Sequence, residues 1–173
     1  MIQETRRQEA EKNFKRYLEE GLIKKAKNQT AQKIFLQNAH DSLRASQLLL
    51  DNNIPLWTIV SAYYSMFYMA NATLLAYHYK VGDKIVHKVT ADALIHIIRP
   101  KLKKKLFDNY EDVRKEAMSI AEIRSDELIQ NFDYERNKRN TIQYQTTKED
   151  ITQKANTSLI RAKEFLFEME KLL

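Results

Sequence analysis

The chain has 173 residues, 29 basic and 23 acidic side chains, a formal net charge of +6 and no cysteine. The absence of cysteine excludes a disulfide framework, a thiolate zinc site and a cysteine nucleophile, and it agrees with a reducing cytoplasmic location, which we expect. Two glycines and two prolines are too few for a fold of many short strands, so we expect one all-α domain over residues 1–173.

The N-terminal segment is predicted to form an exposed helix over residues 4–20. Apolar side chains recur there at helical spacing on an otherwise charged sequence, and Gly21 supplies a C-terminal stop. We treat residues 1–27, which comprise this helix and the basic link after it, as an accessory element. The segment is charged from its fourth residue and has no apolar core, so it does not resemble a secretory signal.

A second helix is predicted after the link. Asn28 or Thr30 can cap its N-terminus because both carry a side-chain oxygen that can accept a backbone N–H. Apolar and small residues then recur at a period of about 3.6, and they are Phe35, Ala39, Leu43, Ser46 and Leu50. The helix is expected to end at residues 51–53.

Residues 52–79 contain no charged side chain, so this run must be weighed as a membrane span. Its middle holds Tyr63, Tyr64, Tyr68 and Asn71. A bilayer would leave these polar groups without partners, whereas membrane proteins place tyrosine mainly at the two interfaces. Pro55 fits the first turn of a helix, where its missing N–H is not needed. We therefore expect a central helix covered by its neighbours, and no membrane partner.

A loop at residues 81–84 is predicted to precede a fourth helix at 86–98, which ends before Pro100. The basic sequence KLKKKLF at 101–107 is expected to form a short helical turn. This turn can contact an RNA backbone, or it can be a solvated basic face, and the sequence leaves both readings open.

A fifth helix is predicted at residues 110–132, where the helical pattern of apolar side chains returns. The polar stretch 133–145 loses this spacing. Thr146 with Glu149 then forms a capping box, so a last helix is expected to start there and to carry an apolar stripe toward the C-terminus.

The polar stretch concentrates side chains that can hold phosphate: Arg136, Lys138, Arg139, Asn140 and Tyr144. Arginine offers planar paired donors, asparagine can fix a sugar or backbone group, and tyrosine can stack or donate. The alternative is a solvated connection whose charges only keep it in water. On composition alone, both interpretations stand.

The spacing of Arg139, Asn140 and Tyr144 is similar to the RNxxxY form of a motif of the HEPN family, small helical proteins that act on or beside RNA and nucleotides. Arg136 lies where one prokaryotic branch has an extra arginine. Three further features resemble that branch in order: LEEGLIKK at 18–25, the aromatic-rich AYYSMFYMANATLL at 62–75, and the His87–Lys88 pair.

The resemblance implies an antiparallel bundle of four main helices with accessory N-terminal and short basic helices. It further implies a homodimer in which the two arginine motifs face a shared cleft that binds RNA or nucleotide. Active family members are ribonucleases that need no metal, and many prokaryotic members are toxin or antitoxin partners of a small nucleotidyltransferase. We therefore expect no cofactor and a nucleotidyltransferase as the partner protein.

The chain departs from the family at the catalytic position, because Tyr144 stands where nuclease members have histidine. A free tyrosine has a pKa of about 10, so about one phenol in a thousand is ionised at pH 7, which makes a poor general base. Arg139 can still orient and neutralise a phosphate. His87 supplies the missing imidazole if it reaches the Arg139 cleft; otherwise it caps or packs a helix.

The four histidines never form the Glu-x-x-His pattern of diiron bundles, and only Asp92 with His96 makes a helix-spaced pair, so no metal site is expected. We therefore expect RNA or nucleotide binding as the toxin or regulated component of a pair, with weak or absent metal-independent endoribonuclease activity. The alternative is a catalytically silent helical module that binds a protein partner.

Overall fold

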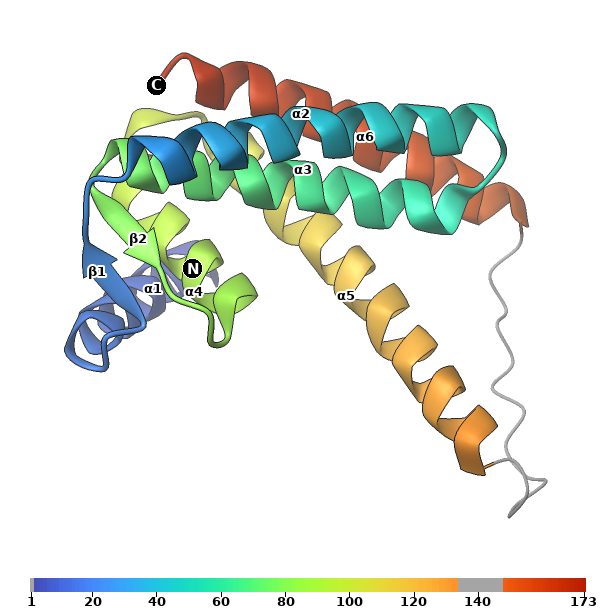
Figure 1. Ribbon diagram of the computed structural model, residues 1–173, viewed down its shortest axis with the longest axis horizontal. Coiled ribbons are helices and arrows are strands. Elements are labelled where there is room, and N and C mark those ends of the chain that lie inside the picture. The colour runs from blue at the N-terminus through green and yellow to red at the C-terminus, as the bar shows by residue number, and fades with distance from the viewer. Residues whose placement is uncertain (1, 134–147) are drawn as a thin grey trace.

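The computed structural model describes residues 2–133 and 148–173, with side chains described for residues 5–121 and 150–173. In chain order, the elements are α1 (Ile2–Glu19), β1 (Ile23–Lys25), α2 (Gln29–Asp51), α3 (Pro55–Ala76), β2 (Tyr79–Val81), α4 (Val86–Ala93), the π-helical turn η1 (Leu94–Ile98), the 3-10 turn η2 (Arg99–Lys101), α5 (Lys104–Asp133) and α6 (Lys148–Glu170). The predicted all-α fold is confirmed, and one small ribbon is added to it (Figure 1).

The uncharged helix α3 lies at the centre of a bundle with α2, α5 and α6 (Figure 1). It starts with Pro55 in its first turn, as predicted. Neighbours pack on it from several sides, and between two of them Tyr110 of α5 stacks on Phe165 of α6 with ring centroids 5.4 Å apart. This burial accounts for the lack of charge in α3. In the part of the chain that the structure describes, no helix combines the length and apolar character needed to cross a bilayer.

Strands β1 and β2 form a two-stranded antiparallel ribbon in which Ile23 pairs with Val81. The sequence predicted only a basic link and a loop at these places. Gly82 ends the ribbon with its N–H donating to the Leu22 carbonyl at 2.8 Å. A Cβ at Gly82 would lie 3.2 Å from that oxygen, so a larger residue would require the Leu22 carbonyl to shift. Gly21, the residue before Leu22, has φ +69° and ends α1, as predicted.

Helix α1 packs against α4 and η1, beside the ribbon (Figure 1). The predicted fourth helix is thus α4 continued by a π-helical turn. The basic sequence 101–107 is divided, because Lys101 ends η2 and Lys104 already starts α5. Asn28 caps α2, since its side chain accepts the Ala31 N–H at 2.8 Å. Thr146, the first residue of the predicted capping box, lies outside the described residues.

Candidate functional site

Most of the predicted site lies outside the described residues. These residues are Arg136, Lys138, Arg139, Asn140 and Tyr144, and their arrangement stays a prediction. His87 is described, and it lies in the first turn of α4, as expected. The site can therefore be built from His87 and from the side chains that surround it.

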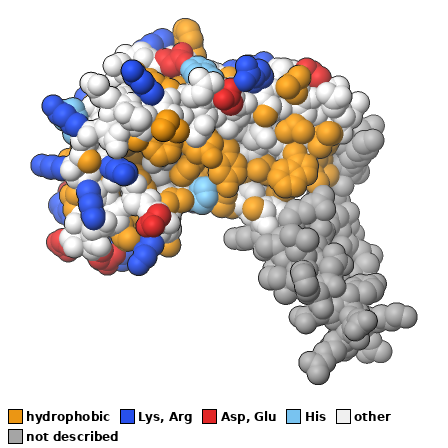
Figure 2. All heavy atoms as spheres, in the orientation of Figure 1, with side chains coloured by type: hydrophobic (Ala, Val, Ile, Leu, Met, Phe, Trp, Pro, Cys, Tyr) orange, Lys and Arg blue, Asp and Glu red, His pale blue; other side chains and the backbone are white. Residues whose placement is uncertain are grey.

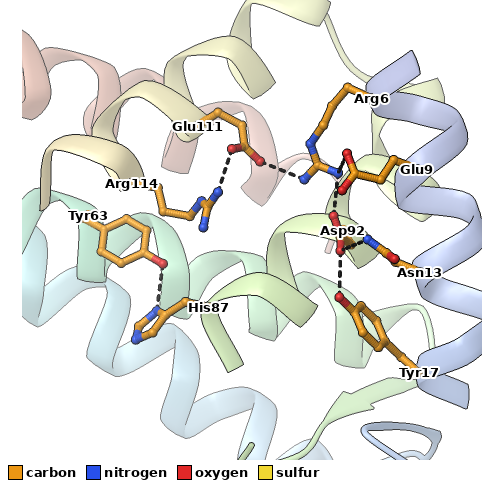
Figure 3. Close-up of polar contacts among 9 residues, drawn as sticks. All are labelled: Arg6, Glu9, Asn13, Tyr17, Tyr63, His87, Asp92, Glu111 and Arg114. Carbon is orange, nitrogen blue, oxygen red and sulfur yellow. Dashed lines mark hydrogen bonds and ion pairs between the residues drawn. The ribbon is translucent and has the colours of Figure 1, made fainter. Parts of the chain in front are cut away.

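The His87 imidazole is partly buried and packs on the aromatic side of α3. Its ring centroid is 4.7 Å from that of Phe67 and 5.9 Å from that of Tyr64. Its Nδ1 lies 2.8 Å from the Tyr63 hydroxyl (Figure 3). Burial, and after it the positive charge of Arg114, lower the pKa of His87, so the ring is neutral at neutral pH.

Tyr63 fixes the orientation of this imidazole. The phenol is fully buried, and burial raises the pKa of Tyr63 far above its ordinary value, so it stays protonated. When its hydroxyl donates to Nδ1 of His87, the ring proton is placed on Nε2. That nitrogen has no hydrogen-bond partner among the described residues, and it is the group through which His87 can meet a ligand.

The backbone just before His87 is strained. Ile85 is the N-cap of α4 and has φ 43° and ψ 36°, a left-handed conformation that β-branched residues rarely adopt. Its side chain is 57% exposed, so burial of the side chain does not offset the strain. Strain of this kind collects near functional sites, and here it sets the entry into the turn that carries His87.

Behind His87, Arg114 of α5 is half-buried and pairs with Glu111 at 2.9 Å. Its Nε is buried without a hydrogen bond among the described residues. The neighbouring Tyr110 hydroxyl is buried too, and burial together with its contact to the Tyr63 hydroxyl raises the pKa of Tyr110. These buried polar groups make the inner wall of the site unusually polar for a helical core.

Glu111 also links the site to α1, because Arg6 reaches it at 3.3 Å and reaches Asp92 at 2.6 Å (Figure 3). Asp92 is fully buried on α4. Its second oxygen accepts hydrogen bonds from Asn13 and Tyr17, both at 2.9 Å. These hydrogen bonds offset the free energy that burial of a charged carboxylate costs.

The network holds no surplus of positive charge. Arg6 and Arg114 face Asp92, Glu111 and, at 4.0 Å from Arg6, Glu9, so two cations meet three anions and neither arginine is left free for a bound phosphate. The network can hold α1, α4 and α5 together and can position His87. A ligand phosphate would have to be neutralised by other basic residues.

Sequence reasoning did not find the roles of Arg6, Glu111 or Arg114, since contacts between residues so distant in the chain have no local signal. Asp92 did carry one, because it is a charged residue in a helix whose neighbouring Val89 and Ala93 are apolar. A charged residue at such a position needs a buried partner.

Within the described ranges, no group of three or more histidine, aspartate or glutamate side chains lies close enough to hold a metal ion. The chemistry of the site is that of a positioned neutral imidazole beside aromatic rings. In comparisons with known proteins, the chain matches no family model, no curated protein and no solved structure.

Proposed function

We propose that the protein binds RNA or a nucleotide as an HEPN-like homodimer, in a cleft formed by Arg139, Asn140 and Tyr144 with Arg136 and Lys138 beside them. It serves as the toxin or regulated component of a pair with a nucleotidyltransferase. The order of features along the chain supports this proposal: a buried aromatic helix is followed by a helix that opens with a histidine.

The single observation that carries the proposal is the position of His87. The imidazole is partly exposed and neutral, it is held by Tyr63, and its Nε2 has no partner among the described residues. It lies beside the face of α3 that carries the aromatic side chains. A structural histidine needs no free nitrogen, whereas a group that meets a phosphate or ribose does. The aromatic rings beside it offer surfaces on which bases can stack.

Catalysis is expected to be weak or absent. Tyr144 replaces the histidine of active family members, and the described arginine whose charge acts on His87, Arg114, is already paired with a carboxylate. A slow endoribonuclease would have to use His87 as its base. The protein therefore binds its ligand more readily than it cleaves it.

The test compares the wild-type protein with Arg139→Ala and with the matched control Arg7→Ala, which removes an exposed arginine of α1. Binding of a labelled tRNA is followed by fluorescence anisotropy, and cleavage of total RNA is followed in chelator. We expect Arg139→Ala to weaken binding about tenfold or more and Arg7→Ala to leave it within about twofold. Equal affinity of all three proteins would end the proposal.

A second candidate is the silent protein-interaction module, and an exposed apolar surface favours it. Trp57 of α3 is 52% exposed, and Figure 2 shows hydrophobic side chains gathered along this helix. Under this function, Trp57→Ala abolishes partner binding or self-association, measured by light scattering, whereas Arg139→Ala and Tyr144→Phe change nothing. The two sets of variants therefore separate the two functions.

A further inference from the structure

The positive charge of the molecule is concentrated in three short segments, residues 21–28, 77–84 and 99–105. They contain ten of the chain's 29 basic residues and only one of its 23 acidic residues, Asp83. The remainder of the chain therefore has more acidic than basic side chains, although the whole carries +6. A surface of this kind is typical of contact with a polyanion.

The fold brings these segments together. Lys24 of β1 and Lys80 of β2 are directly opposite each other in the ribbon. One residue past β1, the Ala26 N–H donates to the His78 carbonyl at 2.9 Å. Next to His78, the Tyr77 ring receives the Lys101 ammonium at 4.2 Å from its centroid. The ribbon and the η2 turn are thus continuous, and Figure 2 shows lysine and arginine side chains at the ribbon end of the molecule. We call this surface the ribbon patch.

The ribbon patch is unneutralised. None of its basic side chains forms an ion pair with any other described residue, although ion pairs occur on α1, α2, α5 and α6. Like charges directly opposite in a two-stranded ribbon destabilise it, and yet Lys24 and Lys80 are placed so, both exposed. A bound anion removes this repulsion.

We propose that the ribbon patch binds the phosphate backbone of RNA, as a second contact surface made of other residues than the proposed Arg139 cleft. The inference rests on the proposed function, because it takes RNA as the ligand. It assigns the two surfaces different tasks. The ribbon patch supplies affinity without reading sequence, and the cleft, with His87, meets the particular nucleotide.

A nucleic-acid backbone fits the ribbon patch better than an anionic membrane does. Membrane surfaces are held by basic side chains together with apolar side chains that enter the lipid. The exposed large hydrophobic side chains found in the described part of the chain lie outside the three segments, and only Ile85 directly follows one of them. The others include Ile34, Leu48, Trp57, Ile160 and Phe167. A phosphodiester chain requires only the cations.

The experiment compares two triple variants of the full chain with equal loss of charge. The patch variant is Lys24→Gln/Lys80→Gln/Lys101→Gln. The control variant is Lys12→Gln/Lys115→Gln/Lys154→Gln, which removes exposed lysines of α1, α5 and α6 that have no ion pair among the described residues. Affinity for single-stranded poly(A) is measured at several salt concentrations, beside Arg139→Ala, and thermal melts confirm that each variant is folded.

We expect the patch variant to bind poly(A) about tenfold more weakly at about 100 mM salt, with the slope of log affinity against log salt reduced by about two. The control variant should remain within about twofold of wild type. Equal losses in the two triple variants would overturn the ribbon patch, because net charge alone would then explain them. Unchanged poly(A) binding together with lost binding to phosphatidylserine vesicles would overturn it in favour of a membrane.

The same measurements distinguish failure of this inference from failure of the proposed function. If Arg139→Ala weakens binding and the patch variant does not, the cleft stands and the ribbon patch is wrong. If only the patch variant weakens binding, the ribbon patch stands and the cleft is wrong. Wild-type protein that does not bind RNA at all would overturn both.

Discussion

The bundle around α3 and the α1–α4 side of the molecule are held together by different kinds of contact. Along most of its length α3 packs with α2 and α6 through apolar side chains, and its own charge-free sequence is buried there. On the side of α1 and α4, a fully buried carboxylate, Asp92, is held by an arginine, an asparagine and a tyrosine. The bundle is therefore stabilised by burial of apolar area, and the α1 side depends on matched polar partners.

The largest effect on stability is expected from a substitution in the polar network on the α1 side. Asp92→Asn removes a fully buried charge that pairs with Arg6 and accepts hydrogen bonds from Asn13 and Tyr17. The free energy of unfolding should fall by about 4 kcal/mol, measured by urea denaturation. Asp108→Asn, at an exposed aspartate, is the control and should change it by less than about 0.5 kcal/mol. Similar values for both variants would contradict the buried network.

The corresponding test of the apolar bundle is a substitution that leaves a cavity in its core. Leu74 is fully buried on α3, so Leu74→Ala should lower the free energy of unfolding by about 3 kcal/mol. Leu48→Ala, at a leucine that is 57% exposed, should have little effect. If the comparison holds, the loss in Leu74→Ala is the same at low and high salt, because no charge is involved.

Relief of strain at the entry to α4 should stabilise the protein. Ile85→Gly replaces a β-branched residue at φ 43° by one that adopts this conformation freely, so thermal unfolding should show a gain of about 1 kcal/mol. Ile54 provides a matched control, since it is also an exposed isoleucine at a helix N-cap but has φ −112°. Ile54→Gly should not stabilise, and a gain at both positions would argue against strain.

A smaller effect is expected from pH. Because burial lowers the pKa of His87, the unfolded chain takes up a proton at this position below about pH 6.5 that the folded protein resists. The stability due to this group is present above that pH and is lost as the pH falls toward the lowered pKa. His87→Asn should therefore lose less stability than wild type between about pH 7.5 and 5.5. A greater loss in the variant would show that folding raises the pKa of His87 and does not lower it.

The smallest effect concerns the ribbon. Lys24→Glu replaces a like-charge pair with Lys80 by an opposite-charge pair, which should raise the free energy of unfolding by about 0.5 kcal/mol at low salt. Lys24→Gln, which only removes the repulsion, should give an intermediate gain, and high salt should remove both gains. If Lys24→Glu destabilises the protein, the register of the ribbon is wrong.

The sequence predicted the helices because their signals are local. The charge-free run placed α3, Asn28 or Thr30 was expected to start α2 and Asn28 does so, and Gly21 marked the end of α1. The ribbon was not predicted because three-residue strands are too short for alternation to be visible, and its pairing joins residues 23 and 81. The π-helical turn after α4 was missed as well, since its apolar sequence is equally compatible with an α-helix.

The candidate site could be predicted only in part. His87 was named from its place at a helix start, and the structure adds its bond to Tyr63, which no spacing along the chain implies. The ion pair between Arg6 and Asp92 joins residues that are far apart in the chain. Neither the sequence around Arg6 nor that around Asp92 indicates it. The Arg136 to Tyr144 cluster remains a sequence prediction.

The ribbon also has a consequence for how the chain folds. β1 leads into α2, and β2 leaves α3, so pairing of the two strands clamps the base of a helical hairpin whose two arms make the most extensive contact between elements in the described part of the chain. A unit closed in this way can form early, because its contacts are near in sequence. Helix α1 and the C-terminal helices would then dock on a finished template, and the order of assembly would run from the middle of the chain outward.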